Sequence, residues 1–205
     1  MEEFHDIEVL KIGDKVPDFE IDVYFPDKKD FSKLKFSDVA KQGKWLVLFF
    51  YPADYTFVCP TELTDIAEKY EIIKNEGAEL VSMSTDTQFV HLAWQQSEKL
   101  LSGVKYPMGA DPTHVISKTF GVYDAETGLA LRGTFIIDPD GKLAATEVNY
   151  YSVGRNSDEL LRKLKAFKFV RENPTQVCPA KWEPGKKTLT PGKELVGKVG
   201  EELHE

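Results

Sequence analysis

The chain has 205 residues, a formal net charge of −8 and a pI near 5.2. Its length allows one large domain, or a domain with an extension. The acidic balance argues against a nucleic-acid partner, because affinity for phosphates comes from clustered lysine and arginine. No stretch approaches the roughly 18 consecutive apolar residues of a membrane span, and the amino terminus lacks the positive start and apolar run of a secretory signal. We therefore expect a cytoplasmic protein that does not contact a membrane.

The first predicted elements lead up to a buried strand. Apolar residues alternate from Phe19 to Phe25, which predicts an edge strand, and Lys28–Lys35 is interpreted as a solvated loop. Trp45–Tyr51 is a continuous apolar run, short enough for a strand that is covered on both faces. Pro52 ends this run.

A helix, a second strand and another helix follow. Within Cys59–Gly77, apolar residues recur at three- and four-residue steps, which predicts an amphipathic helix that begins at Cys59 and closes near Gly77. Ala78–Ser84 predicts a second buried strand. Thr87 is a candidate N-cap for the next helix, which we expect to run to about Leu101.

A hairpin and a final helix come next. Leu131–Asp138 predicts a third strand, and a turn at 139–141 leads to Lys142–Tyr150, which we interpret as its antiparallel neighbour. Asn156 or Ser157 is expected to cap the last helix. The inward face of that helix carries Leu160, Leu161, Leu164 and Phe167. Strands that alternate with helices in this way predict an α/β fold.

The character of the chain changes near Glu172, where Asn173-Pro174-Thr175 ends the last predicted helix. Residues 173–205 contain two Pro-Gly pairs and are interpreted as a C-terminal arm that follows the main domain at 1–172. The apolar residues of the arm are Val177, Trp182, Leu189, Leu195 and Val196. They predict that the arm packs on another surface, such as a second subunit.

Both cysteines, Cys59 and Cys178, lie in the tripeptide Val-Cys-Pro, the first between a strand and a helix and the second in the polar arm. Two lone cysteines are more often inert, since buried cysteine behaves as a small hydrophobic residue. Their flanking residues instead favour a redox couple of two unequal thiols. In a reducing compartment a disulfide is more often transient and catalytic than structural.

The segment Pro52–Cys59 concentrates the chemistry. A cysteine in the first turn of a helix lies near unpaired backbone N–H groups and the positive end of the helix dipole, which stabilises a thiolate. Ionisation alone accelerates attack only about thirty-fold, because a thiol is already a few per cent ionised at neutral pH. Thr56 can supply a hydroxyl near the developing charge. Arg132 and Arg155 can each supply a permanent cation or can be surface residues, and the residues alone leave this open.

Several other kinds of site are disfavoured. Glu62 stands where a C-x-x-C motif would have its second cysteine, and a carboxylate there is typical of a helix start, so a thioredoxin-like disulfide exchanger is not expected. The four histidines have no spacing typical of a metal site. There is no glycine-rich phosphate loop or dinucleotide fingerprint. We expect no metal and no organic cofactor, so electrons would come from another protein.

Taken together, these motifs resemble the typical 2-Cys peroxiredoxins, and among them the bacterial alkyl hydroperoxide reductase C subgroup. Pro52, Thr56 and Cys59 form the Pro-x-x-x-Thr-x-x-Cys motif, Arg132 matches the downstream arginine, and Val177–Trp182 matches the arm that carries a second cysteine. The resemblance covers nearly the whole chain. It implies a thioredoxin-like fold with peroxiredoxin additions, with the peroxidase domain at 1–172 and an extended arm at 173–205.

The resemblance also implies an activity, the reduction of hydrogen peroxide and organic hydroperoxides to water and alcohols. Cys59 would be the peroxidatic cysteine, which becomes a sulfenic acid. Cys178 would be the resolving cysteine, which condenses with the sulfenic acid to form a disulfide. Thr56 and Arg132 would hold the two peroxide oxygens, and Pro52 would shield the sulfur from water.

Supporting residues and partners follow from the same resemblance. Arg155 matches a second family arginine, and Glu62 matches its hydrogen-bonding partner. The disulfide would join two subunits of a homodimer, dimers would assemble into a ring, commonly a decamer, and the reductant would be a flavoprotein disulfide reductase or thioredoxin. Because bridged cysteines have Cα atoms within about 7 Å of each other, the first helical turn at Cys59 is expected to unwind during the cycle.

Two departures from the family pattern concern over-oxidation. Leu101–Tyr106 lacks the Gly-Gly-Leu-Gly insertion of oxidation-sensitive relatives, and Gly200–Glu205 lacks their Tyr-Phe tail. We therefore expect resistance to over-oxidation. Two other function classes remain as alternatives. A disulfide oxidoreductase would exchange disulfides without peroxide, and a ring-forming chaperone would suppress aggregation even after Cys59→Ser.

Overall fold

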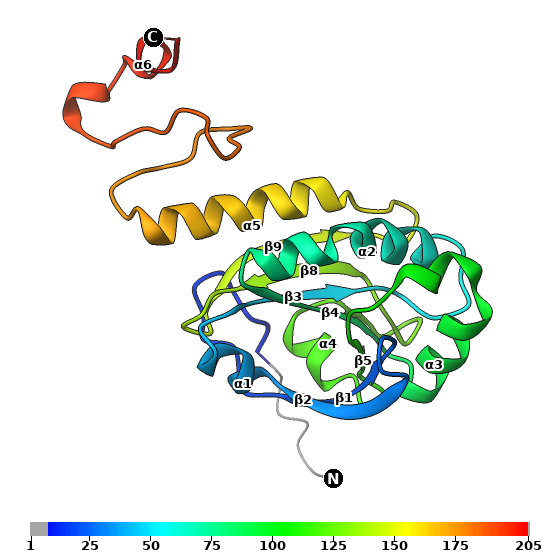
Figure 1. Cartoon of the computed structure of the whole chain (residues 1–205). Helices are drawn as coiled ribbons and strands as arrows, with labels where there is room; N and C mark the ends of the chain where they lie inside the picture. Colours follow the sequence, from blue (N-terminus) through cyan, green and yellow to red (C-terminus); the bar gives the residue numbers. More distant parts are fainter. Residues whose placement is uncertain (1–7, 205) are drawn as a thin grey trace. The chain divides into compact units, whose positions relative to one another are not determined.

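A computed structural model describes residues 8–204, so the amino terminus on which we based the absence of a signal lies outside the described residues. The chain forms two compact units, Met1–Asn156 and Ser157–Glu205, and each is described by itself (Figure 1). Within the described part, no helix is long and apolar enough to span a membrane.

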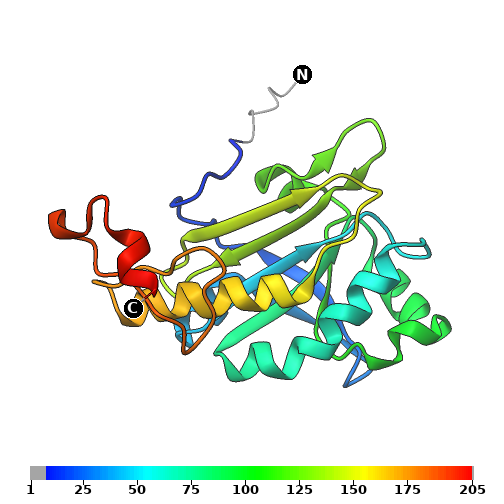
Figure 2. The same ribbon diagram turned by 90° about the horizontal axis from the view of Figure 1, so that it is seen from above.

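The first unit is built on a seven-stranded mixed sheet with the strand order β2-β1-β5-β4-β3-β8-β9. Its parallel centre consists of β3 (Trp45–Phe50), β4 (Ala78–Ser84) and β5 (Met108–Ala110). β8 (Arg132–Ile137) pairs antiparallel with β3, and β9 (Leu143–Asn149) runs antiparallel beside β8 at the edge (Figure 2). The four strands expected in these regions are confirmed, with ends that differ by no more than one residue.

Two expectations for the start of the chain are wrong. β1 (Glu20–Phe25) is not an edge strand, because it lies between β2 (Asp30–Lys35) and β5. Lys28–Lys35 is not a loop, since most of it forms β2, which pairs with β1 along its whole length. Almost every β2 residue is exposed. A strand that buries so little of either face has no apolar alternation, because that pattern arises from the burial of one face.

Helices cover both faces of the sheet. α2 (Cys59–Asn75) lies on one face, while α1 (Phe36–Lys41) and α4 (Val115–Thr119) lie on the other (Figure 1). Alternate residues of β3 belong to the core beneath α1 and α4, which includes Phe36, Val39, Leu46, Leu48, Phe50, Ile116 and Phe120. α2 begins at Cys59, as predicted, and ends just before Gly77, whose φ of +77° is a conformation that glycine adopts without strain.

The helix after Thr87 is shorter than expected. α3 spans Gln88–Ser97, and a 3₁₀ turn, η1 (Lys99–Gly103), follows it. Glu98 separates the two because its backbone is extended and its side chain accepts a hydrogen bond from the Leu100 N–H. Thr87 occupies the N-cap position, although its side chain makes no capping hydrogen bond.

Besides β2 and η1, five further short elements of the first unit were not predicted. They are α1, α4, β5 and the hairpin strands β6 (Tyr123–Asp124) and β7 (Leu129–Ala130), and none of them exceeds six residues. Periodicity needs a longer window than this to be recognised.

The second unit contains α5 (Ser157–Glu172), η2 (Lys193–Leu195) and α6 (Val199–His204). The expected inward residues of α5 are buried at Leu160, Leu161 and Leu164 and half-buried at Phe167. Beyond α5, the ring of Trp182 packs against Phe169 with 4.9 Å between centroids, and Val177 forms an antiparallel bridge with Leu189. The arm therefore has internal structure, and our boundary after residue 172 stays a prediction.

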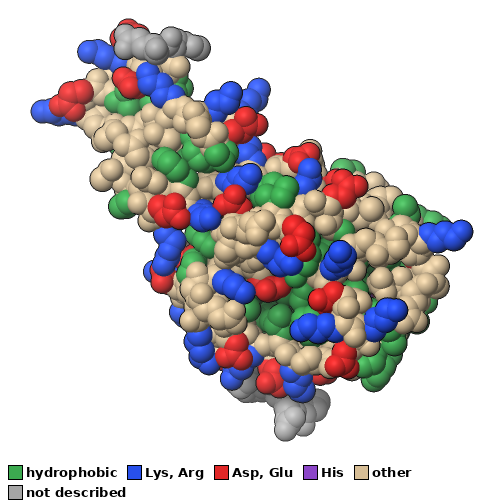
Figure 3. Space-filling view, viewed as in Figure 1, with side chains coloured by type: hydrophobic (Ala, Val, Ile, Leu, Met, Phe, Trp, Pro, Cys, Tyr) green, Lys and Arg blue, Asp and Glu red, His purple; other side chains and the backbone are tan. Residues whose placement is uncertain are grey.

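The surface carries charges of both signs. On the face shown in Figure 3, the lysines and arginines among the described residues are interspersed with aspartates and glutamates. Such a distribution differs from the clustered basic patch that typically binds nucleic acid.

Candidate active site

The Cys59 thiol lies where the loop after β3 enters α2, at the carboxyl end of the parallel strands. This edge of an α/β sheet is where ligands commonly bind. Cys59 is completely buried, and the N-cap residue Val58 makes no capping hydrogen bond through its side chain. The positive end of the α2 dipole therefore acts directly on the sulfur.

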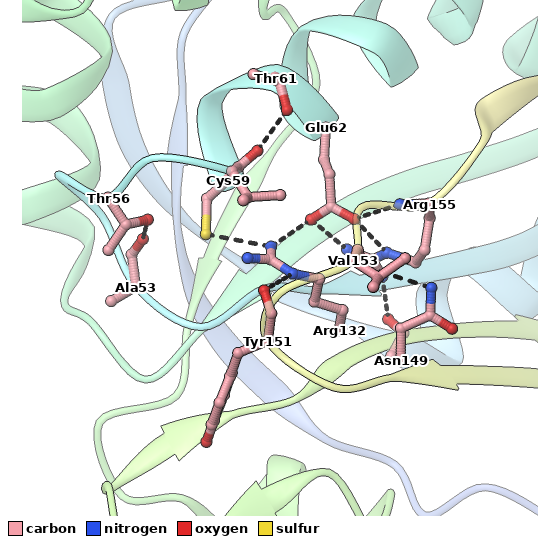
Figure 4. Close-up of polar contacts among 12 residues, drawn as sticks. Ala53, Thr56, Cys59, Thr61, Glu62, Arg132, Asn149, Tyr151, Val153 and Arg155 are labelled. Carbon is pink, nitrogen blue, oxygen red and sulfur yellow. Dashed lines mark hydrogen bonds and ion pairs between the residues drawn. The ribbon is translucent and has the colours of Figure 1, made fainter.

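Arg132, the first residue of β8, brings a permanent positive charge to the thiol (Figure 4). Its Nη1 lies 3.4 Å from Cys59 Sγ and donates to Glu62 Oε2 at 2.6 Å. Its Nε donates to the Tyr151 carbonyl at 2.8 Å. Because contacts on both sides fix its plane, the guanidinium is oriented before any ligand arrives.

Glu62 joins the two arginines. Besides the bond from Arg132, its carboxylate accepts hydrogen bonds from the Arg155 backbone N–H at 2.8 Å, from Arg155 Nε at 2.9 Å and from Arg155 Nη2 at 3.1 Å. Arg155 also donates to the Gly133 carbonyl, and its guanidinium lies 3.4 Å from the centroid of the Phe49 ring. This combination of bidentate pairing and cation–π contact keeps the carboxylate in one orientation.

The charges of the three ionic side chains in this cluster do not cancel. The side chains of Arg132, Arg155 and Glu62 are each no more than 4% exposed, and together they carry one excess positive charge. Burial lowers the pKa of Arg155, and Glu62 opposes this effect, so the guanidinium stays charged. Glu147, whose charge also acts on Arg155, is partly exposed. An uncompensated buried charge is costly, and ionisation of Cys59 brings the sum of the four buried groups to zero.

Thr56 and Pro52 belong to the loop that precedes Cys59. Thr56 Oγ1 donates to the Ala53 carbonyl at 2.8 Å, and in the view of Figure 4 the sulfur lies between Thr56 and Arg132. Pro52 is buried. The structure thus joins four of the predicted residues, Cys59, Glu62, Arg132 and Arg155, in one bonded cluster.

Cys178 belongs to the second unit. Its Sγ lies 3.9 Å from the Ala166 carbonyl. Burial raises the pKa of the Cys178 thiol, and the positive charge of Arg162 opposes that effect. The environment of Cys178 therefore favours a protonated thiol.

Sequence analysis did not identify Tyr151, whose backbone carbonyl orients Arg132. The Tyr151 hydroxyl donates to Asp124 Oδ2 at 2.6 Å, and the Thr127 hydroxyl lies 2.7 Å from it. Burial, together with the bond to Asp124, raises the pKa of Tyr151 to about 12. A contact through a backbone carbonyl leaves no mark on the residue type, so no sequence signal could have revealed it.

Comparisons with known families and relatives agree with this geometry. Residues 12–146 match the AhpC/TSA family, and residues 166–199 match the C-terminal domain of 1-Cys peroxiredoxin. The chain is 51% identical over 176 residues to alkyl hydroperoxide reductase C of Bacillus subtilis, across 84% of this chain and 94% of the relative. It is 48% identical over 188 residues to alkyl hydroperoxide reductase C of Amphibacillus xylanus, across 92% and 98%.

Solved structures give the same result. The crystal structure of Enterococcus faecalis AhpC matches with a TM-score of 0.77 and 42% identity, across 82% of this chain and 98% of that one. The reduced 2-Cys peroxiredoxin of Plasmodium vivax matches with a TM-score of 0.84 and 30% identity, across 90% and 95%. These matches confirm the thioredoxin-like α/β fold. The chain therefore belongs to the AhpC/TSA family of peroxiredoxins.

Proposed function

We infer that this protein is a thiol peroxidase that reduces hydrogen peroxide and organic hydroperoxides, and we propose Cys59 as its peroxidatic cysteine. One observation carries the assignment. The buried Cys59 sulfur lies 3.4 Å from Arg132, within a cluster in which only a thiolate balances the charges of Arg132, Arg155 and Glu62. A thiolate, not a thiol, is the nucleophile.

The chemical step transfers one oxygen atom to sulfur. The Cys59 thiolate attacks one peroxide oxygen, an S–O bond forms as the O–O bond breaks, and the electron pair moves to the second oxygen. That oxygen takes up a proton and leaves as water or an alcohol, while sulfur is oxidised to a sulfenic acid. Arg132 and the Thr56 hydroxyl stabilise the charge that develops on the leaving oxygen, and Pro52 excludes water from the sulfur.

We propose Cys178 as the resolving cysteine. Its thiol condenses with the Cys59 sulfenic acid, a disulfide forms and water leaves. Since Cys59 is completely buried in the first unit, its sulfur has to leave the pocket before a second sulfur can bond to it at about 2 Å. The absence of a side-chain cap on α2 favours opening of this first turn, because no capping bond is lost.

The remaining parts of the proposal concern partners. The disulfide joins the subunits of a homodimer, dimers form a ring of ten subunits, and a flavoprotein disulfide reductase or thioredoxin returns both cysteines to thiols. No metal or organic cofactor takes part. We place the protein in the cytoplasm, where catalytic disulfides are reduced again after each turnover.

Intact mass and non-reducing gels test the assignments. The reduced wild type, Cys59→Ser and Cys178→Ser are each treated with one equivalent of hydrogen peroxide. We expect a disulfide-linked dimer for the wild type only, and a trapped sulfenic acid for Cys178→Ser only. Slow oxidation that is equal at both cysteines would overturn the peroxidase assignment, and a disulfide within one chain would overturn the intersubunit link.

A further inference from the structure

A buried cluster of three titratable side chains lies next to the Cys59 loop and has no part in the mechanism above. The side chains of Tyr51, Asp54 and His91 are each no more than 1% exposed. The Tyr51 hydroxyl donates to Asp54 Oδ1 at 2.7 Å, and His91 Nδ1 lies 2.8 Å from Asp54 Oδ2. His91 Nε2 lies 3.1 Å from the Gly109 carbonyl. Both ring nitrogens of His91 therefore lie within hydrogen-bond distance of acceptor oxygens, and the ring links the Asp54 carboxyl to the backbone of β5.

The backbone of Asp54 belongs to a peptide group of the loop that is hydrogen-bonded at both edges. The N–H of the Ala53–Asp54 peptide donates to Asp86 Oδ2 at 2.9 Å, and the carbonyl of the same peptide accepts from Thr56 Oγ1 at 2.8 Å. Asp86 in turn accepts from the Ser84 hydroxyl at 2.7 Å. Contacts at both edges therefore determine the plane of this peptide, and with it the position of the Thr56 hydroxyl.

The loop needs such support because its backbone is strained. Tyr55, directly after Asp54, has a φ of +54°, in the left-handed region that non-glycine residues rarely adopt. Tyr55 is 58% exposed, so burial of this residue does little to stabilise its conformation. A strained residue persists only where its surroundings determine the backbone, and such residues are common at functional sites.

The supporting groups come from three neighbouring strands. Asp54 follows β3, Asp86 follows β4 and the Gly109 carbonyl belongs to β5, so all of them lie near the carboxyl end of the parallel centre of the sheet. Burial raises the pKa of Asp54, and the bond and charge of His91 oppose that effect. The Asp54–His91 contact therefore connects the loop to the core of the first unit.

We propose that Asp54 and His91 are positioning residues for peroxide reduction. They fix the Ala53–Asp54 peptide and the left-handed turn at Tyr55, and so hold the Thr56 hydroxyl at the sulfur. Neither side chain touches the peroxide. The inference rests on the proposed function, and in particular on the role of Thr56.

Two reactions of Cys59 separate this role from a general loss of structure. All variants are made in the Cys178→Ser background, so that Cys59 is the only thiol. Rapid quench measures sulfenic acid formation by hydrogen peroxide, and iodoacetamide measures alkylation, which needs the thiolate but not Thr56. We expect Asp54→Asn and His91→Gln each to slow the peroxide reaction about tenfold, because a small misplacement of a reacting group costs this much or more. Alkylation should stay within about twofold of the parent rate.

A double-mutant cycle tests whether the effect passes through Thr56. Thr56→Val alone should slow the peroxide reaction, and addition of Asp54→Asn to Thr56→Val should slow it no further. If Thr56→Val leaves the peroxide rate unchanged, the proposed role of Thr56 fails and the inference fails with it. If Thr56→Val slows the reaction but Asp54→Asn and His91→Gln do not, or if their effects add to it, only the inference is overturned.

Milder variants keep the test valid if Asp54→Asn or His91→Gln does not fold. Tyr51→Phe removes one donor to Asp54 and should slow only the peroxide reaction, by about threefold, the rate equivalent of a modest neutral hydrogen bond. Tyr70→Phe is the matched control, because Tyr70 also bonds a carboxylate, Glu79 at 3.4 Å, but lies in the C-terminal half of α2. Equal slowing of peroxide reaction and alkylation in Tyr51→Phe would indicate a structural role and overturn the inference.

Discussion

Replacement of Arg132 by lysine separates the charge of this residue from its geometry. The guanidinium contacts Cys59 Sγ at 3.4 Å, Glu62 at 2.6 Å and the Tyr151 carbonyl at 2.8 Å at the same time. An ammonium group keeps the charge, but it has no planar fork and cannot make all three contacts. Loss of one directed donor to a developing oxyanion costs about 2.7 to 4 kcal/mol. We therefore expect Arg132→Lys to slow Cys59 oxidation about 100-fold, which is about 2.7 kcal/mol in the activation free energy.

The assay compares two second-order rate constants, one for Cys59 with hydrogen peroxide and one for Cys59 with iodoacetamide. Alkylation should fall less than about fivefold, because the positive charge near the sulfur remains. Arg162→Lys is the matched control, since Arg162 pairs with the partly exposed Glu159 in the second unit and should leave both rates unchanged. A peroxide rate within about threefold of the wild type, or an equal fall in the two rates, would refute a directional role for the guanidinium.

Three further predictions concern stability, pH and over-oxidation. Glu62→Gln should lower the free energy of unfolding by about 3 kcal/mol, since it leaves two buried guanidinium groups without their anion, whereas the exposed-pair control Glu159→Gln should cost at most about 1 kcal/mol. Urea titrations that show equal losses would contradict this reasoning. The pKa of Tyr151 is raised to about 12 from an ordinary value of about 10, so its contribution to stability is present below pH 10 and is lost as the pH rises towards 12. The melting temperature of the wild type should therefore fall more steeply with rising pH than that of Tyr151→Phe in this range. Parallel curves for the two proteins would contradict this contribution of Tyr151. Finally, a modest excess of hydrogen peroxide during turnover should leave Cys59 free of sulfinic acid by intact mass, and accumulation of the sulfinic form would show that the two sequence departures do not confer resistance.

Local patterns were enough to predict the elements that carry Cys59, the proposed nucleophile. The continuous apolar run of β3, the apolar spacing along α2 and the start of that helix at Cys59 all follow from neighbouring residues. The spacing of apolar residues in a strand or helix depends on which of its own faces is buried. This spacing can therefore be recognised within a short stretch of sequence. Pro52, Thr56 and Cys59 lie within the same eight residues, which is why the sequence was sufficient to single them out together.

Only the tertiary structure decided which charged residues meet. Arg132 and Arg155 could each have been surface residues, yet they contact Glu62 from 70 and 93 residues away. His91 looked like an isolated histidine, yet it pairs with Asp54 across 37 residues. The polar strand β2 was interpreted as a loop, because only its pairing with β1 makes it a strand. Ion pairs and strand pairs join segments that are distant in sequence, and their energies depend on burial and register, which exist only once the chain has folded.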